Sequence, residues 1–138
     1  MNELIDDIMS ALTDSRWDVG DHQFPKNAGW QGDQITGTFK PFVVAYFSGS
    51  TDIDGSFGSP ESEQRLSVTL NLFGAKRSQT TQLADVVRPL LKDLNQTLHG
   101  DYFVQYVALD IIGSVQRLDS WDKPLFLITD RYTLFTTQ

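Results

Sequence analysis

One stretch, Arg65 to Leu98, most constrains the fold, because a strand pattern there turns directly into a helix pattern. Its first half, RLSVTLNLF, alternates apolar with polar residues, which is the period of two that buries one face of a strand. Its second half places apolar residues at intervals of three and four, as a single stripe along a helix. That stripe consists of Leu83, Val86, Val87, Leu90, Leu91, Leu94 and Leu98. The strand should be half buried, and the rest of the chain must cover the stripe.

The ends of this helix are predicted from residue chemistry. Residues Phe73 to Gln79 should form the corner, with Gly74 where the strand stops. Ser78 or Thr80 can accept a hydrogen bond from an amide of the first helical turn. Gly100 suits the far end, because glycine adopts the left-handed conformation at little cost.

Pro89 is the irregularity in the helix pattern. Proline lacks the amide that would bond to the carbonyl of Asp85, and it costs ~3 kcal/mol in a regular helix interior. We therefore expect a kink or a break near Val87 and Arg88. The apolar stripe continues in phase beyond Pro89, so packing against a sheet should keep both halves on one line.

Length and composition predict a single domain over residues 1–138 that can bury a core. The sequence has 40% hydrophobic residues but no apolar run of the roughly 18 residues that a membrane-spanning helix needs. The opening segment MNELIDDIMSALTD has no basic region before its apolar positions, so it is not expected to be a secretory signal. Cysteine is absent, which excludes disulfides, thiolate catalysis and sulfur-dependent zinc sites. These features predict a cytoplasmic product that is stabilised by packing.

The formal net charge of −7 argues against a protein that grips the phosphate backbone of nucleic acid. Such a protein would need clustered lysine and arginine. The charge is compatible with a surface past which nucleic acid slides without binding, and equally with simple solubility.

The N-terminal part of the chain divides into a helix and an arm. Asn2 to Leu12 carries apolar residues on one face and acidic residues early, which predicts a short amphipathic helix. Residues 14–37 show no sustained period and contain several glycines, so we expect an irregular arm. Its aromatic residues, Trp17, Phe24 and Trp30, should pack either on their own domain or on a neighbouring subunit.

Four further segments, together with the strand after Arg65, have the residue pattern of strands. Thr38 to Ser48 and the strand after Arg65 should form a hairpin with a long tip over residues 49–62. Tyr102 to Ala108, Ile111 to Leu118 and Leu125 to Phe135 follow the central helix, and Asp130 interrupts the apolar face of the last. The order predicts an α+β fold. We expect a mostly antiparallel sheet of about five strands, packed by the kinked central helix and the short N-terminal helix.

No pattern of catalytic residues stands out, and we predict neither enzyme activity nor a cofactor. The two histidines are His22 in the arm and His99 near the helix end, where the helix dipole favours a structural role. No serine lies in a G-x-S-x-G elbow, and no glycine-rich turn resembles a phosphate loop.

The hairpin tip partly matches the residue pattern of a calcium-binding loop. Counted from Asp52, the residues Asp54, Ser56 and Glu63 fall at positions three, five and twelve of an EF-hand loop. Position six, which needs glycine, is Phe57, and both flanks read as strands. We therefore predict a solvated acidic loop and no metal site.

The chain as a whole is similar to the tail terminator, or tail completion, proteins of long-tailed bacteriophages. The resemblance is carried by the helix LIDDIMSAL, the strand PFVVAYF, a long polar loop, the strand RLSVTLNLFG leading directly into TTQLADVVRPLLKDL, and the last strand LFLITDRYTLFTT. It covers nearly the whole chain in outline. It is an order of elements and local phrases, without a catalytic motif that could be carried over residue by residue.

This resemblance implies a structural virion protein that forms a ring, commonly a homohexamer, on the end of the tail tube. The ring would stop tube polymerisation and offer a surface to the head-completion or connector proteins, while DNA passes through its centre without specific binding. Its place would be the virion tail, after assembly in the host cytoplasm and without a membrane. The arm with Trp17, Phe24 and Trp30 could then lie across the neighbouring subunit. The acidic tip could face the tube or the channel through Asp52, Asp54, Glu61 and Glu63.

Two other classes of protein stay open. One is another head-tail connector or minor tail protein of the same kind of particle. The other is a small-ligand-binding α+β domain, which would need a concave pocket with convergent polar groups.

Overall fold

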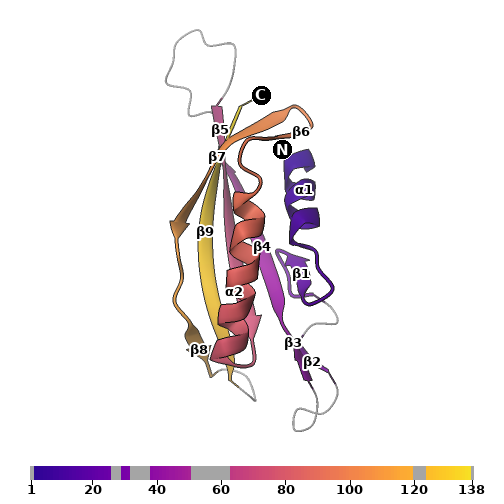
Figure 1. The fold of residues 1–138 in the computed structure, drawn as a ribbon, viewed down its shortest axis with the longest axis vertical. Helices are drawn as coiled ribbons and strands as arrows, with labels where there is room; N and C mark the ends of the chain where they lie inside the picture. Colours follow the sequence, from indigo (N-terminus) through magenta and orange to yellow (C-terminus); the bar gives the residue numbers. More distant parts are fainter. Residues whose placement is uncertain (1, 26–28, 32–37, 51–62, 120–123, 138) are drawn as a thin grey trace.

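The computed structural model describes residues 2–25, 29–31, 38–50, 63–119 and 124–137 (Figure 1). Within these described residues, two helices and nine strands follow one another. In order they are α1 (Asn2–Leu12), β1 (Asp18–Asp21), β2 (Gly29–Gln31), β3 (Thr38–Lys40), β4 (Phe42–Ser50), β5 (Glu63–Gly74), α2 (Arg77–Lys92), β6 (Thr97–His99), β7 (Tyr102–Ile111), β8 (Gln116–Leu118) and β9 (Leu125–Thr137).

The main sheet has seven strands, of which six follow the order β1-β4-β5-β9-β7-β6, while β8 pairs with β9 beyond the end of β7. Strand β1 pairs with β4 in parallel, and every other described pair is antiparallel. Strands β2 and β3 form a separate two-stranded sheet. The predicted α+β class with a mostly antiparallel sheet is confirmed, whereas the predicted number of about five strands is too low.

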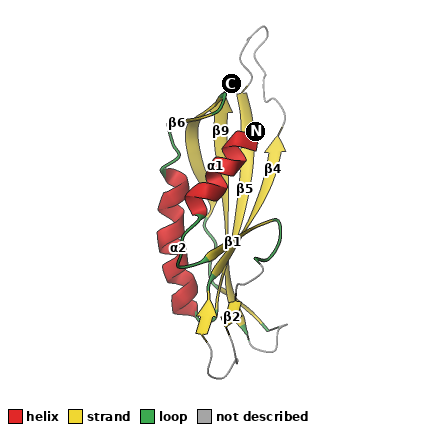
Figure 2. Cartoon of the chain, turned by 90° about the vertical axis from the view of Figure 1, so that its right-hand side faces the viewer, coloured by secondary structure: helices red, strands yellow, loops and turns green. Residues whose placement is uncertain are grey.

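Both helices cover the same face of the sheet, and together they form one layer over it (Figures 1 and 2). The core lies between this layer and the sheet, and β5 supplies its centre with four residues that are at most 1% exposed: Leu66, Val68, Leu70 and Leu72. The apolar stripes of α1 and α2 face these residues, with Leu4, Ile8 and Leu12 from α1 and Leu83, Val87 and Leu91 from α2. The predicted half-buried strand is therefore confirmed. The predicted stripe is covered from Leu83 to Leu94, whereas its last member, Leu98, lies in β6 and is 68% exposed.

Helix α2 begins differently from the prediction. The residue before it is Lys76, whose side chain makes no capping hydrogen bond. Gln79 instead accepts a hydrogen bond from the amide of Ala75 at 2.8 Å through its Oε1 atom. The hydroxyl of Thr80 donates to the carbonyl oxygens of Lys76 and Phe126, each at 3.1 Å. Thr80 therefore fastens the helix to β9 and is not its cap.

Helix α2 also ends earlier than expected. It stays continuous through Val87, Arg88 and Pro89, so the predicted kink or break is not confirmed. Pro89 lies in the last turn, where its carbonyl accepts a hydrogen bond from Asp93. The chain then turns through Gln96, which has a φ of 62°. Gly100, with a φ of 61°, lies in the turn between β6 and β7, so it does not close the helix as predicted.

Three predicted segments differ in the structure. Thr38 to Ser48 is divided at Pro41 into β3 and β4. Ile111 to Leu118 is not one strand, because β7 ends at Ile111 and only β8, at Gln116–Leu118, is extended and paired. The arm is not wholly irregular, since β1 within it continues the main sheet. The partner of β1 is β4, which lies more than 20 residues farther along the chain, so the local sequence does not predict this pairing.

Candidate functional site

The candidate functional surface is the side of the sheet that carries no described helix, called here the helix-free face. Its centre consists of the residues of β5 and β9 that alternate with the core: Arg65, Ser67, Thr69, Asn71, Thr129, Arg131, Thr133 and Phe135. Thr129 donates a hydrogen bond to the side-chain oxygen of Asn71 at 2.9 Å, which links the two strands on this face. The polar half of the predicted alternation thus forms a broad surface of hydroxyl, amide and guanidinium groups.

Aromatic side chains cover one end of the helix-free face. The rings of Phe42 and Phe73 are stacked with their centroids 4.6 Å apart, and Phe24 lies 5.4 Å from both. Trp30 makes an edge contact with Phe39 at 5.3 Å. Two of the three aromatic arm residues, Phe24 and Trp30, therefore pack on their own chain, although 46% of Phe24 stays exposed.

The third arm residue, Trp17, is only 3% exposed and belongs to the core under α1. Its indole nitrogen donates to the carbonyl of Leu12 at 2.8 Å, and the guanidinium of Arg16 lies 5.0 Å from its ring centroid. Arg16 also pairs with Asp14 and lowers the pKa of that carboxyl group to about 2 through hydrogen bonds. This burial leaves little of Trp17 for contact with a neighbouring subunit.

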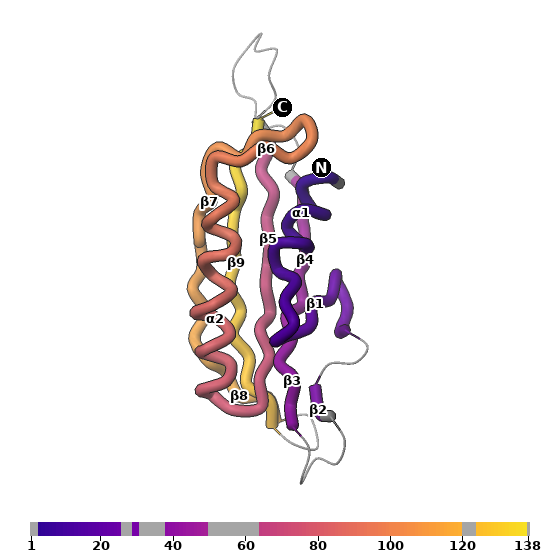
Figure 3. The backbone as a smooth tube through the Cα atoms, turned by 45° about the vertical axis from the view of Figure 1, so that its right-hand side comes forward, coloured from indigo at the N-terminus to yellow at the C-terminus, as the bar shows by residue number. Residues whose placement is uncertain are grey.

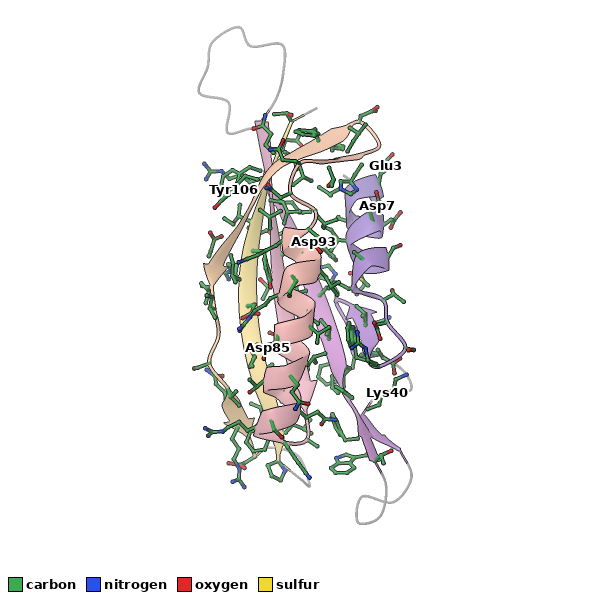
Figure 4. All side chains as sticks on the ribbon, in the orientation of Figure 1. Glu3, Asp7, Lys40, Asp85, Asp93 and Tyr106 are labelled. Carbon is green, nitrogen blue, oxygen red and sulfur yellow. The ribbon has the colours of Figure 1, made fainter. Side chains whose placement is uncertain are left out.

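The other end of the helix-free face is more open. The guanidinium of Arg65 lies 5.0 Å from the ring centroid of Phe135, and Tyr106 lies 6.2 Å from the same ring. Tyr106, in the middle of β7, is 58% exposed. Ile111 at the end of β7 and Ile112 just after it are 49% and 65% exposed. In Figure 4 Tyr106 stands at the β7 side of the sheet, far from Glu3 and Asp7 on α1. Exposed apolar residues along one strand are of the kind that a partner can cover.

At this end of the sheet, the outer edges of β4 and β7 also pair with no described strand. Strand β1 pairs with β4 only from Phe42 to Ala45, and among the described strands none pairs with the outer edge of Tyr46–Ser50. Strand β6 pairs with β7 only from Tyr102 to Val104. Within the described chain, Tyr106–Ile111 has no strand on its outer edge either. Exposed strand edges of this kind are templates for pairing with another chain.

A buried carboxylate holds the middle of the fold together. Asp130 of β9 is completely buried, and its Oδ2 and Oδ1 atoms accept hydrogen bonds from Nε and Nη2 of Arg88 at 2.9 and 3.1 Å. Its Oδ1 atom also accepts the amide of Gly113 at 2.9 Å. This pairing raises the pKa of Arg88. The apparent interruption of the last strand is therefore a structural ion pair between α2, β9 and the segment after β7.

Tyr132 lies two residues farther along the same face of β9 and is also fully buried. Its hydroxyl has no hydrogen-bond partner among the described residues. Burial, together with the negative charge of Asp130, raises the pKa of this hydroxyl well above its usual value. A neutral phenol in an apolar core is a packing element, and nothing positions it for proton transfer.

His99 has a structural role, although not the predicted one. It lies in β6 and not at the end of α2, so the helix-dipole explanation is wrong. Its Nδ1 atom is 2.6 Å from Asp7 of α1, and its Nε2 atom is 2.6 Å from the hydroxyl of Thr97. That hydroxyl donates to the carbonyl of Leu94. The cluster therefore ties α1 to β6 and to the turn after α2.

In this cluster a carboxylate, an imidazole and a hydroxyl contact one another in the same sequence as in a hydrolytic triad, but the hydroxyl is not set up as a nucleophile. A triad needs the hydroxyl to donate its proton to the imidazole, which acts as the general base. Here the Thr97 hydroxyl also contacts the carbonyl oxygen of Leu94, which competes with the Nε2 atom of His99 for the single hydroxyl proton. That competition opposes the activation of Thr97 as a nucleophile.

The residues predicted at the acidic tip fall mostly outside the described part of the chain. Asp52, Asp54 and Glu61 are not described, and Glu63 is described only as the first residue of β5, without its side chain. Residues 52–63, which partly match a calcium-binding loop, lie in the same region. Among the residues that the structure does describe, no three histidine, aspartate or glutamate side chains are grouped to hold a metal ion.

No family model matches this chain, and no curated protein matches it. Within the described residues, no helix has the length and apolar character required to cross a membrane.

Proposed function

We propose that the protein is a structural virion protein similar to phage tail terminators. Copies of the chain form a ring, a hexamer by analogy with that family, on the end of the tail tube. The ring stops tube polymerisation and provides the surface for head attachment, while DNA passes through the centre.

The observation that supports this proposal most directly is the pair of open strand edges on opposite sides of one sheet. A ring subunit needs two different contact surfaces, one for each neighbour. The order of elements adds support, because α1, β4, β5 leading into α2, and β9 match the order on which the resemblance rests. The net charge of −7 suits a channel through which DNA passes without adhering.

The test uses the purified chain and tubes assembled from the tail tube protein of the same phage. Tubes grown with the protein are expected to be short and uniform in electron micrographs, with a cap at one end, and those grown without it to be long and variable. Light scattering of the protein, alone and with tubes, should reveal the ring. A monomer under both conditions, together with equal tube growth, would rule out the terminator function.

Two further measurements separate the alternatives. Antibody labelling of virions should mark the junction of head and tail for a terminator, whereas label at the tail tip would favour a minor tail protein. A thermal-shift screen against metabolites should give no hit for a ring subunit. A reproducible shift with one compound class would instead favour a small-ligand-binding domain.

A further inference from the structure

We propose that the open edge of β7 in one copy pairs with the open edge of β4 in the next copy, so that the sheet continues from subunit to subunit. The partner is a second copy of this chain. This inference rests on the proposed ring, and it names the contact that would build it.

The first support is that the two open edges lie at the same level of the sheet. Residues directly opposite one another can be followed from β4 through β5 and β9 to β7. Ser48 faces Ser67, which faces Thr133, which faces Ala108. By the same path Tyr46 reaches the level of Ile111, and Ser50 reaches the level of Tyr106. The open stretch of β4 and that of β7 therefore begin and end together.

The strand directions also fit. Three antiparallel pairings separate β4 from β7, so these strands run in opposite directions within one chain. A rotation about an axis along the strands preserves those directions. The β7 edge of one copy then meets the β4 edge of its neighbour as an antiparallel pair, which is the more stable arrangement per residue.

The side chains that would meet across this pair are complementary. At equal level, Ile111 lies opposite Tyr46 on the helix-free face, and Leu109 lies opposite Phe47 on the core face. A β-branched residue opposite an aromatic one, as Ile111 is to Tyr46, stabilises antiparallel strands, and Leu109 opposite Phe47 adds an apolar contact. The pairing would also cover Ile111, which is half exposed in the single chain.

The charges of the helical layer match the same arrangement. Helix α1 contains three acidic residues, Glu3, Asp6 and Asp7, and no basic residue. Helix α2 contains Arg77, Arg88 and Lys92 but only one acid, Asp85. In Figure 3, α1 lies on the β1 and β4 side of the sheet and α2 on the β7 and β9 side.

Arg88 identifies the flank of α2 that faces away from α1, because it bonds to Asp130 of β9. Asp130 balances the charge of Arg88, so the basic charge that this flank offers to a neighbour comes from Lys92. Lys92 lies one turn farther along the same flank. When β7 of one copy meets β4 of the next, this basic flank approaches the acidic α1 of the neighbour. Opposite charges at the contact favour that orientation over its reverse.

His22 covers part of the β4 edge in the single chain. Its Nε2 atom accepts the amide of Phe47 at 3.2 Å, and its backbone has a φ of 58°. Pairing with a second copy would displace this side chain from the edge. The variant His22→Ala should therefore associate at lower protein concentration than the wild type.

Cysteine cross-linking tests the contact directly, because the natural chain contains no cysteine. The double variant Ser48→Cys with Ala108→Cys places one thiol on each open edge at the same level. Within one chain these positions are three strand spacings apart, or about 14 Å, which is too far for a disulfide. Mild oxidation of the concentrated protein should give a ladder of linked subunits that ends at the ring size.

Four variants serve as controls. Ser48→Cys with Gln116→Cys keeps the same two sides of the sheet but places the second thiol at the level of Phe42, about 20 Å away along the strands. It should give no ladder. Each of the single variants Ser48→Cys and Ala108→Cys should give dimers at most. Ser67→Cys with Thr133→Cys, which are direct neighbours in one chain, should form an internal disulfide and prove that oxidation worked.

The outcomes separate this inference from the proposed function. The edge contact would be overturned if the folded double variant Ser48→Cys with Ala108→Cys stayed monomeric or dimeric. It would also be overturned if this variant formed no more linked subunits than the control with Gln116→Cys. If the wild type still capped tubes, the terminator function would stand without it. A complete ladder combined with no effect on tube length would keep the contact and remove the terminator function.

Discussion

Asp130 is the residue on which three parts of the fold depend. Its carboxylate accepts hydrogen bonds from Arg88 and from the amide of Gly113, and it is completely shielded from water. A Cβ atom at Gly113 would lie 2.1 Å from the carbonyl oxygen of Thr129, so only glycine allows this close approach. In the sequence Asp130 was only an interruption of an apolar face, because its partner lies 42 residues away.

Removing this carboxylate should destabilise the protein strongly. The variant Asp130→Ala leaves Arg88 and the Gly113 amide without their acceptor, so we expect a loss of about 3 kcal/mol in the free energy of unfolding. Urea denaturation followed by circular dichroism measures it. Arg117→Ala, which breaks the exposed pair with Asp119, is the control and should change the value by less than about 0.5 kcal/mol. Equal effects of both variants would contradict the role of Asp130.

Tyr132 gives a prediction with a defined pH dependence. The variant Tyr132→Phe removes a buried hydroxyl that has no partner among the described residues, so stability at neutral pH should rise by about 1 kcal/mol. Burial raises the pKa of this hydroxyl, so the native chain keeps it neutral where the unfolded chain ionises, above pH ~10. The stability of the wild type should therefore be constant from this source below pH 10 and fall above it.

Denaturation of both proteins from pH 7 to pH 11 tests this behaviour, with Tyr46→Phe as the half-buried control. The advantage of Tyr132→Phe should widen above pH 10. A variant that was less stable than the wild type at neutral pH would mean that the hydroxyl has a partner after all.

At the scale of elements, α2 shows that apolar periodicity predicts which residues of a helix are buried but does not predict where the helix ends. The intervals of three and four identified the buried stripe, since Leu83, Val87, Leu91 and Leu94 all face the core. Periodicity did not locate the end of the helix, because Leu98 continues the pattern in β6 and is 68% exposed. The left-handed conformation of Gln96 changes the direction of the chain, and the residue is not the glycine that would have predicted such a turn.

Truncating two leucines of the predicted stripe should distinguish the buried part of the stripe from its exposed end. Leu91→Ala removes a fully buried side chain from α2 and should cost about 3 kcal/mol in the free energy of unfolding. Leu98→Ala removes an exposed one and should change the value by less than about 0.5 kcal/mol. Chemical denaturation measures both. A large loss for Leu98→Ala alone would show that the residue is covered in solution, as it would be at a subunit contact.

For the whole molecule, sequence patterns predicted the class of fold and most strands, because alternation and composition are local properties. They missed the parallel pairing of β1 with β4 and the division between β7 and β8, because both depend on contacts between distant segments. The aromatic arm residues were recognised as packing residues, and the structure places all three against their own chain. The open edges were not predicted, since an edge exists only once the order of strands is known.

The equal level of the two open edges has a geometric consequence for the proposed assembly. Joined at one level, each copy follows the last by pure rotation, and the series can return to its starting point. A shift of one residue between the edges would add about 3.4 Å of rise at every joint and turn the closed series into an open screw. The registers of β5 and β9 with their neighbours fix that level. The three strand pairings between β4 and β7 thus decide whether the proposed assembly is finite.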